Sequence, residues 1–186
     1  VKSVDDNLGN YRIPEAARAL QEFVDDMSNW YVRRCRDRFW AKGMEQDKVN
    51  AYMTLYTALV TVCKAAAPMI PFMTEEIYQN IVRSVDASAK ESIHLCDFPV
   101  YNAEQVDEKL EADMDLVLKI VVLGRACRNG AAIKNRQPIG QMYVKAEASL
   151  PDYDEAIILD ELNVKNITFT DDVSNFTTYN FKPQLK

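Results

Sequence analysis

The stretch PEAARALQEFVDDMSNWYVRRCRDRFW, residues 14–40, predicts a long helix and sets the fold class of the chain. Pro14 suits the first turn of a helix, where a backbone N–H has no intrahelical partner to lose. Apolar side chains then recur at steps of three and four residues, which gives one face about 100° wide. That face carries Leu20, Phe23, Val24, Met27 and Tyr31. We therefore expect a helix that packs against others in a mainly α-helical protein.

The opposite face of this predicted helix combines cations with an aromatic ring. The same spacing places Asn29, Arg33, Arg36 and Trp40 together on it. Arginines neutralise phosphates, and an indole stacks on an unpaired base such as those of an RNA loop. This face is therefore a candidate surface for single-stranded nucleic acid.

A structural interpretation of the same segment remains open at this point. Trp30 and Tyr31 could anchor a core, with the arginines at a solvated helix end beside neighbouring aspartates. Arg34 and Arg38 continue the apolar stripe beyond Tyr31. The end of the helix therefore either leaves the core or buries these guanidinium groups against carboxylates.

Periodicity predicts three more helices and a small α/β region downstream. The helices are expected at residues 47–67, 74–84 and 103–129, with Pro68 and Pro71 ending the first and Thr74 capping the second. Their predicted buried stripes are Tyr52, Leu55, Leu59, Val62 and Ala66 in the first, and Leu110, Met114, Val117, Ile120 or Val121, and Gly124 in the last. Short strands are expected at 92–95, 141–146 and 164–170, with a helix at 154–162. We therefore predict a helical bundle over residues 1–132 and a small α/β subdomain over 133–186.

A second cation-rich stretch, residues 119–145, holds six lysines and arginines and no acid. Within it, IKNRQP at 133–138 places Lys134 and Arg136 at alternate positions, on one side of an extended segment held open by Pro138. This segment and the basic helix could contact an RNA loop from two sides. Alternatively, both charges are edge-strand charges that discourage aggregation.

The composition limits the function of the chain as a whole. Its 186 residues carry a net charge of −6, so the two basic stretches contrast with an acidic remainder, which favours a selective anion contact. Nothing resembles a membrane span or a secretion signal, and the four cysteines are too widely spaced for a zinc or redox motif. We therefore expect a cytoplasmic protein without a metal. The lone His94 has no catalytic partner, and no catalytic site is predicted.

Five segments together resemble the isoleucyl-tRNA synthetase family. They are SNWYVRRCRDRFW (28–40), DKVNAYMTLYTALVTVCKAAAPMIPFMTEEIYQNIV (47–82), SIHLCDFP (92–99), GRACRNGAAIKNRQPIGQMYV (124–144) and DELNVKNITF (160–169). APMIPFMTEEIY alone resembles the wider class I group that includes the valyl and leucyl enzymes. NWYVRR, IKNRQP and ELNVKN point more narrowly to the isoleucyl member.

This resemblance implies the anticodon-binding region of a larger, ATP-dependent isoleucine–tRNA ligase. The partner would be isoleucine tRNA, bound through its anticodon loop, rather than DNA or a membrane, and the parent enzyme would be a monomer. The roles carried over predict RNA contacts at Asn29, Arg33, Arg36, Trp40, Lys134, Arg136 and Gln137. They predict structural support from Trp30, Tyr31, Arg34, Pro68, Pro71 and Phe72.

Several family features are expected to lie outside this chain. It carries no HIGH-like or KMSKS-like motif and no editing domain, so we expect a fragment without cofactors, with ATP bound by an absent catalytic domain. We also expect an earlier bundle helix before Val1 and a longer extension beyond Lys186, since the zinc-binding tail of some bacterial members is not matched. The alternatives are the same domain of a valyl or leucyl enzyme, or a helical protein-interaction module with Trp40 in its hot spot.

Overall fold

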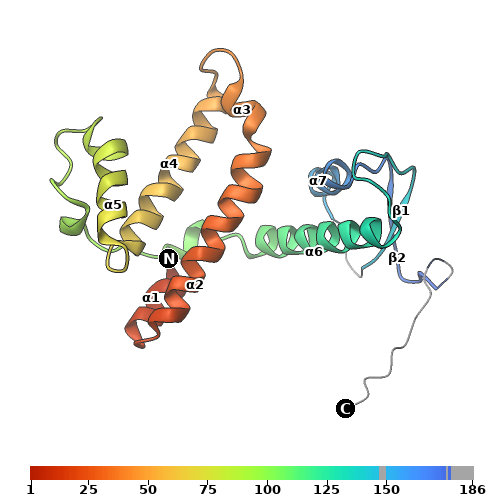
Figure 1. Ribbon diagram of the computed structural model, residues 1–186, viewed down its shortest axis with the longest axis horizontal. Helices are drawn as coiled ribbons and strands as arrows, with labels where there is room; N and C mark the ends of the chain where they lie inside the picture. Colours follow the sequence, from red (N-terminus) through yellow and green to blue (C-terminus); the bar gives the residue numbers. More distant parts are fainter. Residues whose placement is uncertain (147–149, 175, 177–186) are drawn as a thin grey trace. The chain divides into compact units, whose positions relative to one another are not determined.

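The computed structural model divides the chain into two compact units, which contain the elements labelled in Figure 1. Unit 1 comprises Val1–Ala103 and unit 2 comprises Glu104–Lys186. The structure describes residues 1–146, 150–174 and 176. This division falls before the boundary predicted at 132/133, because the long helix α6 (Glu108–Gly130) packs against α7 (Asp152–Leu162).

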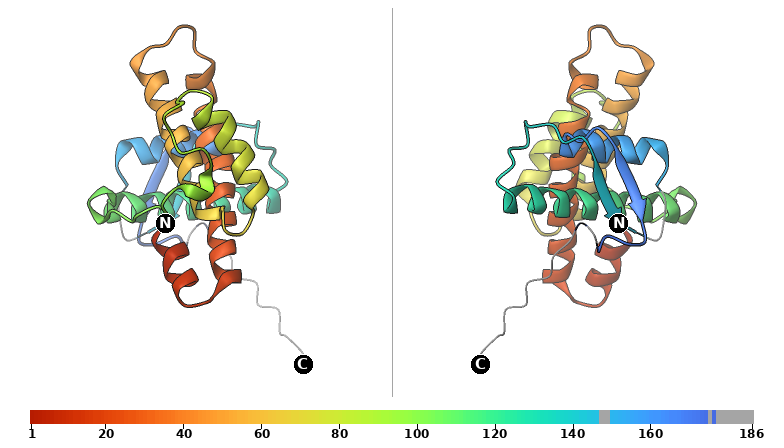
Figure 2. Two further views of the ribbon diagram at one scale, coloured as in Figure 1. Left: turned by 90° about the vertical axis from the view of Figure 1, so that its left-hand side faces the viewer. Right: turned by 90° about the vertical axis from the view of Figure 1, so that its right-hand side faces the viewer.

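Unit 1 is a helical bundle in which α1 folds back along the start of α2 and α4 returns beside the same helix (Figures 1 and 2). The predicted helix over 14–40 is a continuous helical path with irregular segments. The elements are α1 (Lys2–Gly9), α2 (Ile13–Asp26), η1 (Met27–Val32), α3 (Arg36–Trp40), α4 (Gln46–Ala66), α5 (Pro71–Tyr78), η2 (Gln79–Arg83) and η3 (Ile93–Leu95). The prediction of a mainly helical fold is confirmed.

Small side chains make the closest contact between α1, α2 and α4. Val4, Ala16 and Ala65 form one buried cluster. The predicted apolar stripe of α2 is only partly buried, with Phe23 47% and Val24 40% exposed. The reason is an open groove of about 720 Å³ beside the alanine contact, which Phe23 lines without being covered.

Helix α4 follows its prediction closely in extent, but of its predicted buried stripe only Ala66 is among the fully buried residues. The side chains that it fully buries are Ala51, Cys63, Ala65 and Ala66. Tyr52, predicted to be buried, is 44% exposed. Its ring packs on Phe39 with 5.0 Å between centroids, and its hydroxyl donates to the Phe39 carbonyl oxygen at 3.3 Å, so it supports the end of the bundle rather than its core.

Two local predictions between residues 71 and 95 are wrong. Helix α5 begins at Pro71 and not at Thr74, because a proline at the first helical position leaves no N–H unsatisfied. Thr74 is buried inside the helix and donates its hydroxyl to the Ile70 carbonyl oxygen at 3.0 Å. The predicted strand at 92–95 is instead the short helical turn η3, since Ser92 Oγ accepts the His94 N–H at 3.2 Å and closes the chain locally.

Unit 2 contains one long helix and a parallel two-stranded sheet whose strands are joined by a crossover helix. The strands β1 (Met142–Lys145) and β2 (Ile167–Thr170) pair with Met142 opposite Ile167, and α7 connects them. The short turn η4 (Ala103–Gln105) precedes α6. Helix α6 begins later than predicted because the Asp107 carboxylate accepts the Leu110 N–H at 3.0 Å and caps it.

The core of unit 2 lies between α6 and α7. Val117 and Val121 of α6 and Ile158 and Leu162 of α7 are almost fully buried, whereas the predicted core residue Leu110 is 49% exposed. Gly124 allows the close approach of the two helices, because a Cβ atom at this position would clash with the Leu162 side chain.

Candidate nucleic-acid interface

A π-helical turn separates the packed part of the first long helical run from its exposed tip. Helix α2 continues into η1, and after Cys35 the short helix α3 forms the tip. A π turn contains one residue more than an α turn, so it rotates the following side chains by about 100° relative to a regular helix. Residue faces assigned at regular α spacing therefore do not carry through η1 unchanged.

Three of the four residues predicted to share a face of this helix surround one open hollow at the tip. The hollow has a volume of about 310 Å³ and is lined by Ser28, Val32, Arg33, Arg36, Phe39 and Trp40. Asn29 is exposed but does not line it, and within the π turn Ser28 and Val32 line the hollow instead. Its carbonyl oxygen accepts from Arg33 Nε at 2.7 Å.

Guanidinium groups lie over both indole rings of the tip. Arg36 Cζ is 5.2 Å from the centroid of the Trp40 ring, and Arg33 Cζ is 5.6 Å from that of Trp30. Both distances are within the range of cation–π attraction. Trp40 is 74% exposed, whereas Trp30 is half-buried. The tip therefore presents an accessible aromatic surface with a cation already beside it.

The neighbouring residues hold this tip against the start of α4. The Tyr31 hydroxyl donates to the Ala51 carbonyl oxygen at 3.0 Å, and its ring meets Phe39 edge to face at 6.3 Å. Arg38 donates from Nε and Nη2 to the two carboxylate oxygens of Asp47 at 2.8 and 2.7 Å. This hydrogen-bonded pair lowers the pKa of the Asp47 carboxyl. Arg38 thus pairs with a carboxylate, but the pair is not buried, since the side chains of Arg38 and Asp47 are 37% and 69% exposed.

The remaining predicted support residues differ in how they contribute. Arg34 is half-buried. Pro68 follows the end of α4, and Pro71 starts α5. Phe72, in contrast, is 89% exposed and packs little, because the helix that begins at Pro71 directs Thr74 and Tyr78 to the interior instead.

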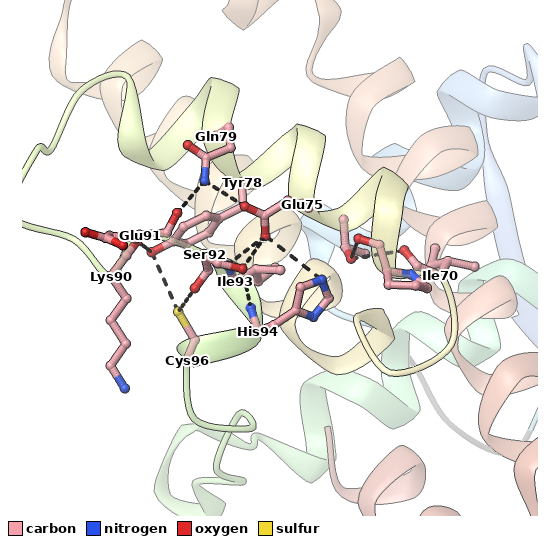
Figure 3. A network of polar contacts seen from close by, with 12 residues as sticks. Ile70, Glu75, Tyr78, Gln79, Lys90, Glu91, Ser92, Ile93, His94 and Cys96 are labelled. Atoms are coloured by element: carbon pink, nitrogen blue, oxygen red, sulfur yellow. Dashed lines mark hydrogen bonds and ion pairs between the residues drawn. The ribbon is translucent and has the colours of Figure 1, made fainter.

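Helix α5 is tied to the loop that follows it by the polar network drawn in Figure 3. One Glu75 oxygen accepts from Ser92 Oγ at 2.7 Å and from the Ile93 N–H at 3.0 Å, and the other accepts from Gln79 Nε2 at 2.7 Å. The hydrogen bond from Ser92 is the main cause of a lowered pKa of the Glu75 carboxyl. His94 lies at the edge of this network, with Nε2 4.0 Å from Glu75.

Tyr78 forms the buried centre of the same region. Its hydroxyl donates to the Lys90 carbonyl oxygen at 2.9 Å, and burial raises the pKa of Tyr78 to about 12. Cys96 Sγ lies 3.6 Å from that hydroxyl. The network therefore holds the loop that follows α5, with His94 at its edge.

In unit 2, the segment at 133–138 is a tight turn and not the extended segment predicted. The Gln137 N–H donates to the Lys134 carbonyl oxygen at 2.9 Å, which places Asn135 and Arg136 at the tip of the turn. Arg128 closes it from within, because Nη1 donates to the carbonyl oxygens of Lys134 and Gln137, both at 3.0 Å. Lys134, Arg136 and Gln137 are exposed on the outside.

Two of the six cations in residues 119–145 form ion pairs or hydrogen bonds within unit 2. Arg128 is 3% exposed, and Arg125 pairs with Glu161 of α7, whose side chain is 3% exposed. Lys119, Lys134, Arg136 and Lys145 remain exposed. The hollow at the tip belongs to unit 1 and this turn belongs to unit 2, so each is a separate candidate surface.

The sequence did not reveal the two residues whose side chains hold the turn, Arg128 and Asn163. Asn163 ends α7 in the left-handed conformation, with φ of 49°, and its Nδ2 donates to the Asn135 carbonyl oxygen at 3.1 Å. An asparagine directly after a predicted helix is a recognised signal for this cap and could have identified it. No comparable local signal distinguishes the buried Arg128 from its exposed neighbours.

Cysteines and acids supply no candidate metal centre within the described part of the chain. All four cysteines are free thiols, with Cys35 and Cys63 buried and Cys127 exposed. Among the residues that the structure describes, no group of three or more His, Cys, Asp or Glu could hold a metal ion. None of the described helices has the length and apolar character needed to cross a membrane.

Comparison with known proteins shows one family for the chain as a whole. The family "Anticodon-binding domain of tRNA ligase" matches residues 1–144. An isoleucine–tRNA ligase of Clostridium novyi is 53% identical over 185 residues, and one of Clostridium tetani is 51% identical over the same length. Both alignments cover 100% of this chain and 18% of the relative. An isoleucine–tRNA ligase of Dehalococcoides mccartyi is 46% identical over 171 residues, which cover 89% of the chain and 17% of the relative.

Proposed function

This chain belongs to the family of anticodon-binding domains of tRNA ligases, and from that membership we propose that it binds the anticodon loop of isoleucine tRNA. Four clostridial relatives, all named isoleucine–tRNA ligase, are 51–53% identical over 99–100% of the chain. These names favour isoleucine over the valyl and leucyl alternatives.

The observation that carries the proposal is the pairing of Arg36 with the exposed ring of Trp40. A base from an unpaired loop can stack on an indole, and a cation beside the ring can meet the phosphate that accompanies the base. Arg33 borders the same hollow and adds a second positive charge. Lys134, Arg136 and Gln137 are proposed as a further RNA contact from unit 2.

The activity of the parent protein is part of the same proposal. The chain spans 18% of the length of its clostridial relatives. We assign the ATP-dependent attachment of isoleucine to other parts of a cytoplasmic, monomeric ligase, with tRNA and neither DNA nor a membrane as the partner of this region. The residues described here would then contribute recognition and positioning of the tRNA.

The test is the affinity of the 186-residue chain for an isoleucine anticodon stem-loop, measured by fluorescence anisotropy at two salt concentrations. Stem-loops with valine and leucine anticodons serve as competitors. We expect preference for the isoleucine anticodon and a steep loss of affinity with salt. Equal binding of the three stem-loops would mean that this chain does not discriminate between their anticodons. A mild salt dependence would favour the protein-interaction alternative.

Single substitutions connect this binding to the hollow. Arg36→Ala should lower the slope of log affinity against log salt by about 0.7–0.9, the value for one lost phosphate contact. Trp40→Ala should weaken binding by about 1–3 kcal/mol with the slope preserved, because stacking is lost and charge is not. Arg18→Ala removes an exposed cation of α2 outside the hollow and should bind like the unmodified chain.

A further inference from the structure

The backbone of the turn at 134–137 is held by two side chains, the buried Arg128 and the exposed Asn163. Arg128 donates to the carbonyl oxygens of Lys134 and Gln137, and Asn163 donates to that of Asn135. Three of the four carbonyl groups of the turn therefore accept hydrogen bonds from these two residues. Its outer surface carries the Lys134 and Arg136 side chains.

The same two residues join the turn to the end of α7. Arg128 Nη2 donates to the carbonyl oxygens of Leu162 and Asn163, the latter at 3.1 Å. The last carbonyl groups of a helix lack intrahelical partners and carry partial negative charge, which suits a buried guanidinium group. One side chain therefore satisfies two backbone segments that lie far apart in the sequence.

Backbone hydrogen bonds next to the turn complete this attachment. Ile139 forms a parallel bridge with Val164. The Ile139 N–H donates to the Asn163 carbonyl oxygen at 3.0 Å, and the Lys165 N–H donates to the Ile139 carbonyl oxygen at 2.9 Å. The segments IKNRQP and ELNVKN, which are separated by a strand and a helix, are thus parts of one assembly.

We propose that Arg128 and Asn163 are positioning residues, which hold the 134–137 turn in one conformation so that Lys134 and Arg136 contact phosphates of the tRNA backbone. This inference rests on the proposed function. A turn that is already ordered loses little conformational freedom on binding, so its cations bind phosphate more tightly than the same cations on a mobile loop. Phosphate contacts of this kind position a nucleic acid without reading its sequence.

The variant Asn163→Gly tests the positioning of the turn without changing the charges that the turn carries. Glycine adopts a positive φ without strain, so the cap at the end of α7 is kept while the donation to Asn135 is lost. The double variant Lys134→Ala/Arg136→Ala removes the charges and keeps the donors that anchor the turn. The third protein combines all three substitutions, and the affinity of each for full-length isoleucine tRNA is measured at two salt concentrations.

We expect the double variant to lower the salt slope by about 1.4–1.8, which corresponds to two phosphate contacts. Asn163→Gly alone should weaken binding about threefold, a loss of the size expected for ordering about one long side chain. Asn163→Gly should have no further effect in the double variant, because no cations then remain to be positioned. The melting temperature of every variant is recorded to exclude unfolding as the cause.

Four outcomes would overturn the inference. If Asn163→Gly binds tRNA like the unmodified chain, the turn is not positioned for binding. The same conclusion follows if the affinity lost in Asn163→Gly adds fully to the affinity lost in the double variant. If the double variant binds normally while Trp40→Ala fails, the turn is no RNA contact and the proposed function stands without it. If the unmodified chain binds no tRNA, the proposed function and this inference fail together.

Discussion

The two cation-rich regions of this chain use arginine in opposite ways. At the tip of unit 1, Arg36 is exposed and lies over the Trp40 ring, 5.2 Å from its centroid. In unit 2, Arg128 is 3% exposed and donates to four backbone carbonyl oxygens. The first arginine is available to a ligand, and the second is committed to the fold.

This difference shows how a positive stretch of sequence should be interpreted. A buried guanidinium group must have its hydrogen bonds satisfied within the protein, and it then contributes no accessible charge. Residues 119–145 contain six cations, but Arg125 and Arg128 serve the packing of α6 and α7. The surface that a phosphate can reach is therefore smaller than the charge count suggests, and two of the four exposed cations, Lys134 and Arg136, lie in the 134–137 turn.

The largest expected effect tests this contrast directly through stability. Arg128→Ala should lower the free energy of unfolding of unit 2 by about 3–5 kcal/mol, because buried carbonyl groups lose their charged donor. Arg36→Ala, the matched control in unit 1, should change it by less than about 0.5 kcal/mol, as is usual for a surface substitution. Urea denaturation followed by circular dichroism measures both. Similar losses for the two variants would remove the distinction between the regions.

A smaller effect concerns the acid that fixes α5. Glu75→Gln should destabilise unit 1 by about 1–2 kcal/mol at neutral pH, because hydrogen bonds from Ser92 and Ile93 lose a charged acceptor. The lowered pKa of Glu75 means that its contribution is present above the ordinary glutamate pKa and is lost as the pH falls through the folded value. Unfolding at neutral and acid pH should therefore show a smaller difference between wild type and variant in acid.

The smallest effect has the opposite sign and belongs to unit 2. Asp154 is 2% exposed, and its Oδ2 has no hydrogen-bond partner among the described residues. Burial, with Asp113 nearby, raises the pKa of this carboxyl, while Lys109 lowers it. A raised carboxyl pKa costs stability as the pH rises from the unfolded value through the folded one.

Asp154→Asn should therefore raise the melting temperature at neutral pH, with the gain shrinking near pH 4, about the ordinary value for an aspartate. Asp152→Asn, at an exposed position of the same helix, is the control and should show no such pH-dependent gain. A melting temperature of Asp154→Asn below that of wild type at neutral pH would mean that the ionised carboxylate is stabilising after all.

The sequence was sufficient where the determining signal is local. The extents of α4 and α7, the presence of β1 and β2, and the mainly helical class all follow from apolar periodicity and capping residues. The strand predicted at 92–95 failed because one Ser92 side-chain contact closed a turn. The burial of Arg128 could not be predicted, because its partners Leu162 and Asn163 come from a helix more than thirty residues away.

The candidate site was predictable to a similar degree. Arg33, Arg36 and Trp40 do share a surface, but Asn29 does not line it because the helix widens at η1. Lys134 and Arg136 are exposed as predicted, although the turn that carries them depends on Asn163 at a distance in sequence. RNA binding by any of these residues stays a prediction until it is measured.

The π turn η1 allows the two ends of one helical run, α2 and α3, to change independently during evolution. Its extra residue sets the rotation of α3 independently of α2, so deletion of a single residue between Met27 and Val32 would turn Arg36 and Trp40 by about 100° while α2 kept its neighbours. Mutations that improve packing in α2 and mutations that alter ligand preference in α3 can therefore accumulate without interfering. A length change of one residue in this turn would move the surface of Arg36 and Trp40 and would also break the contacts that Arg38 and Phe39 make with α4.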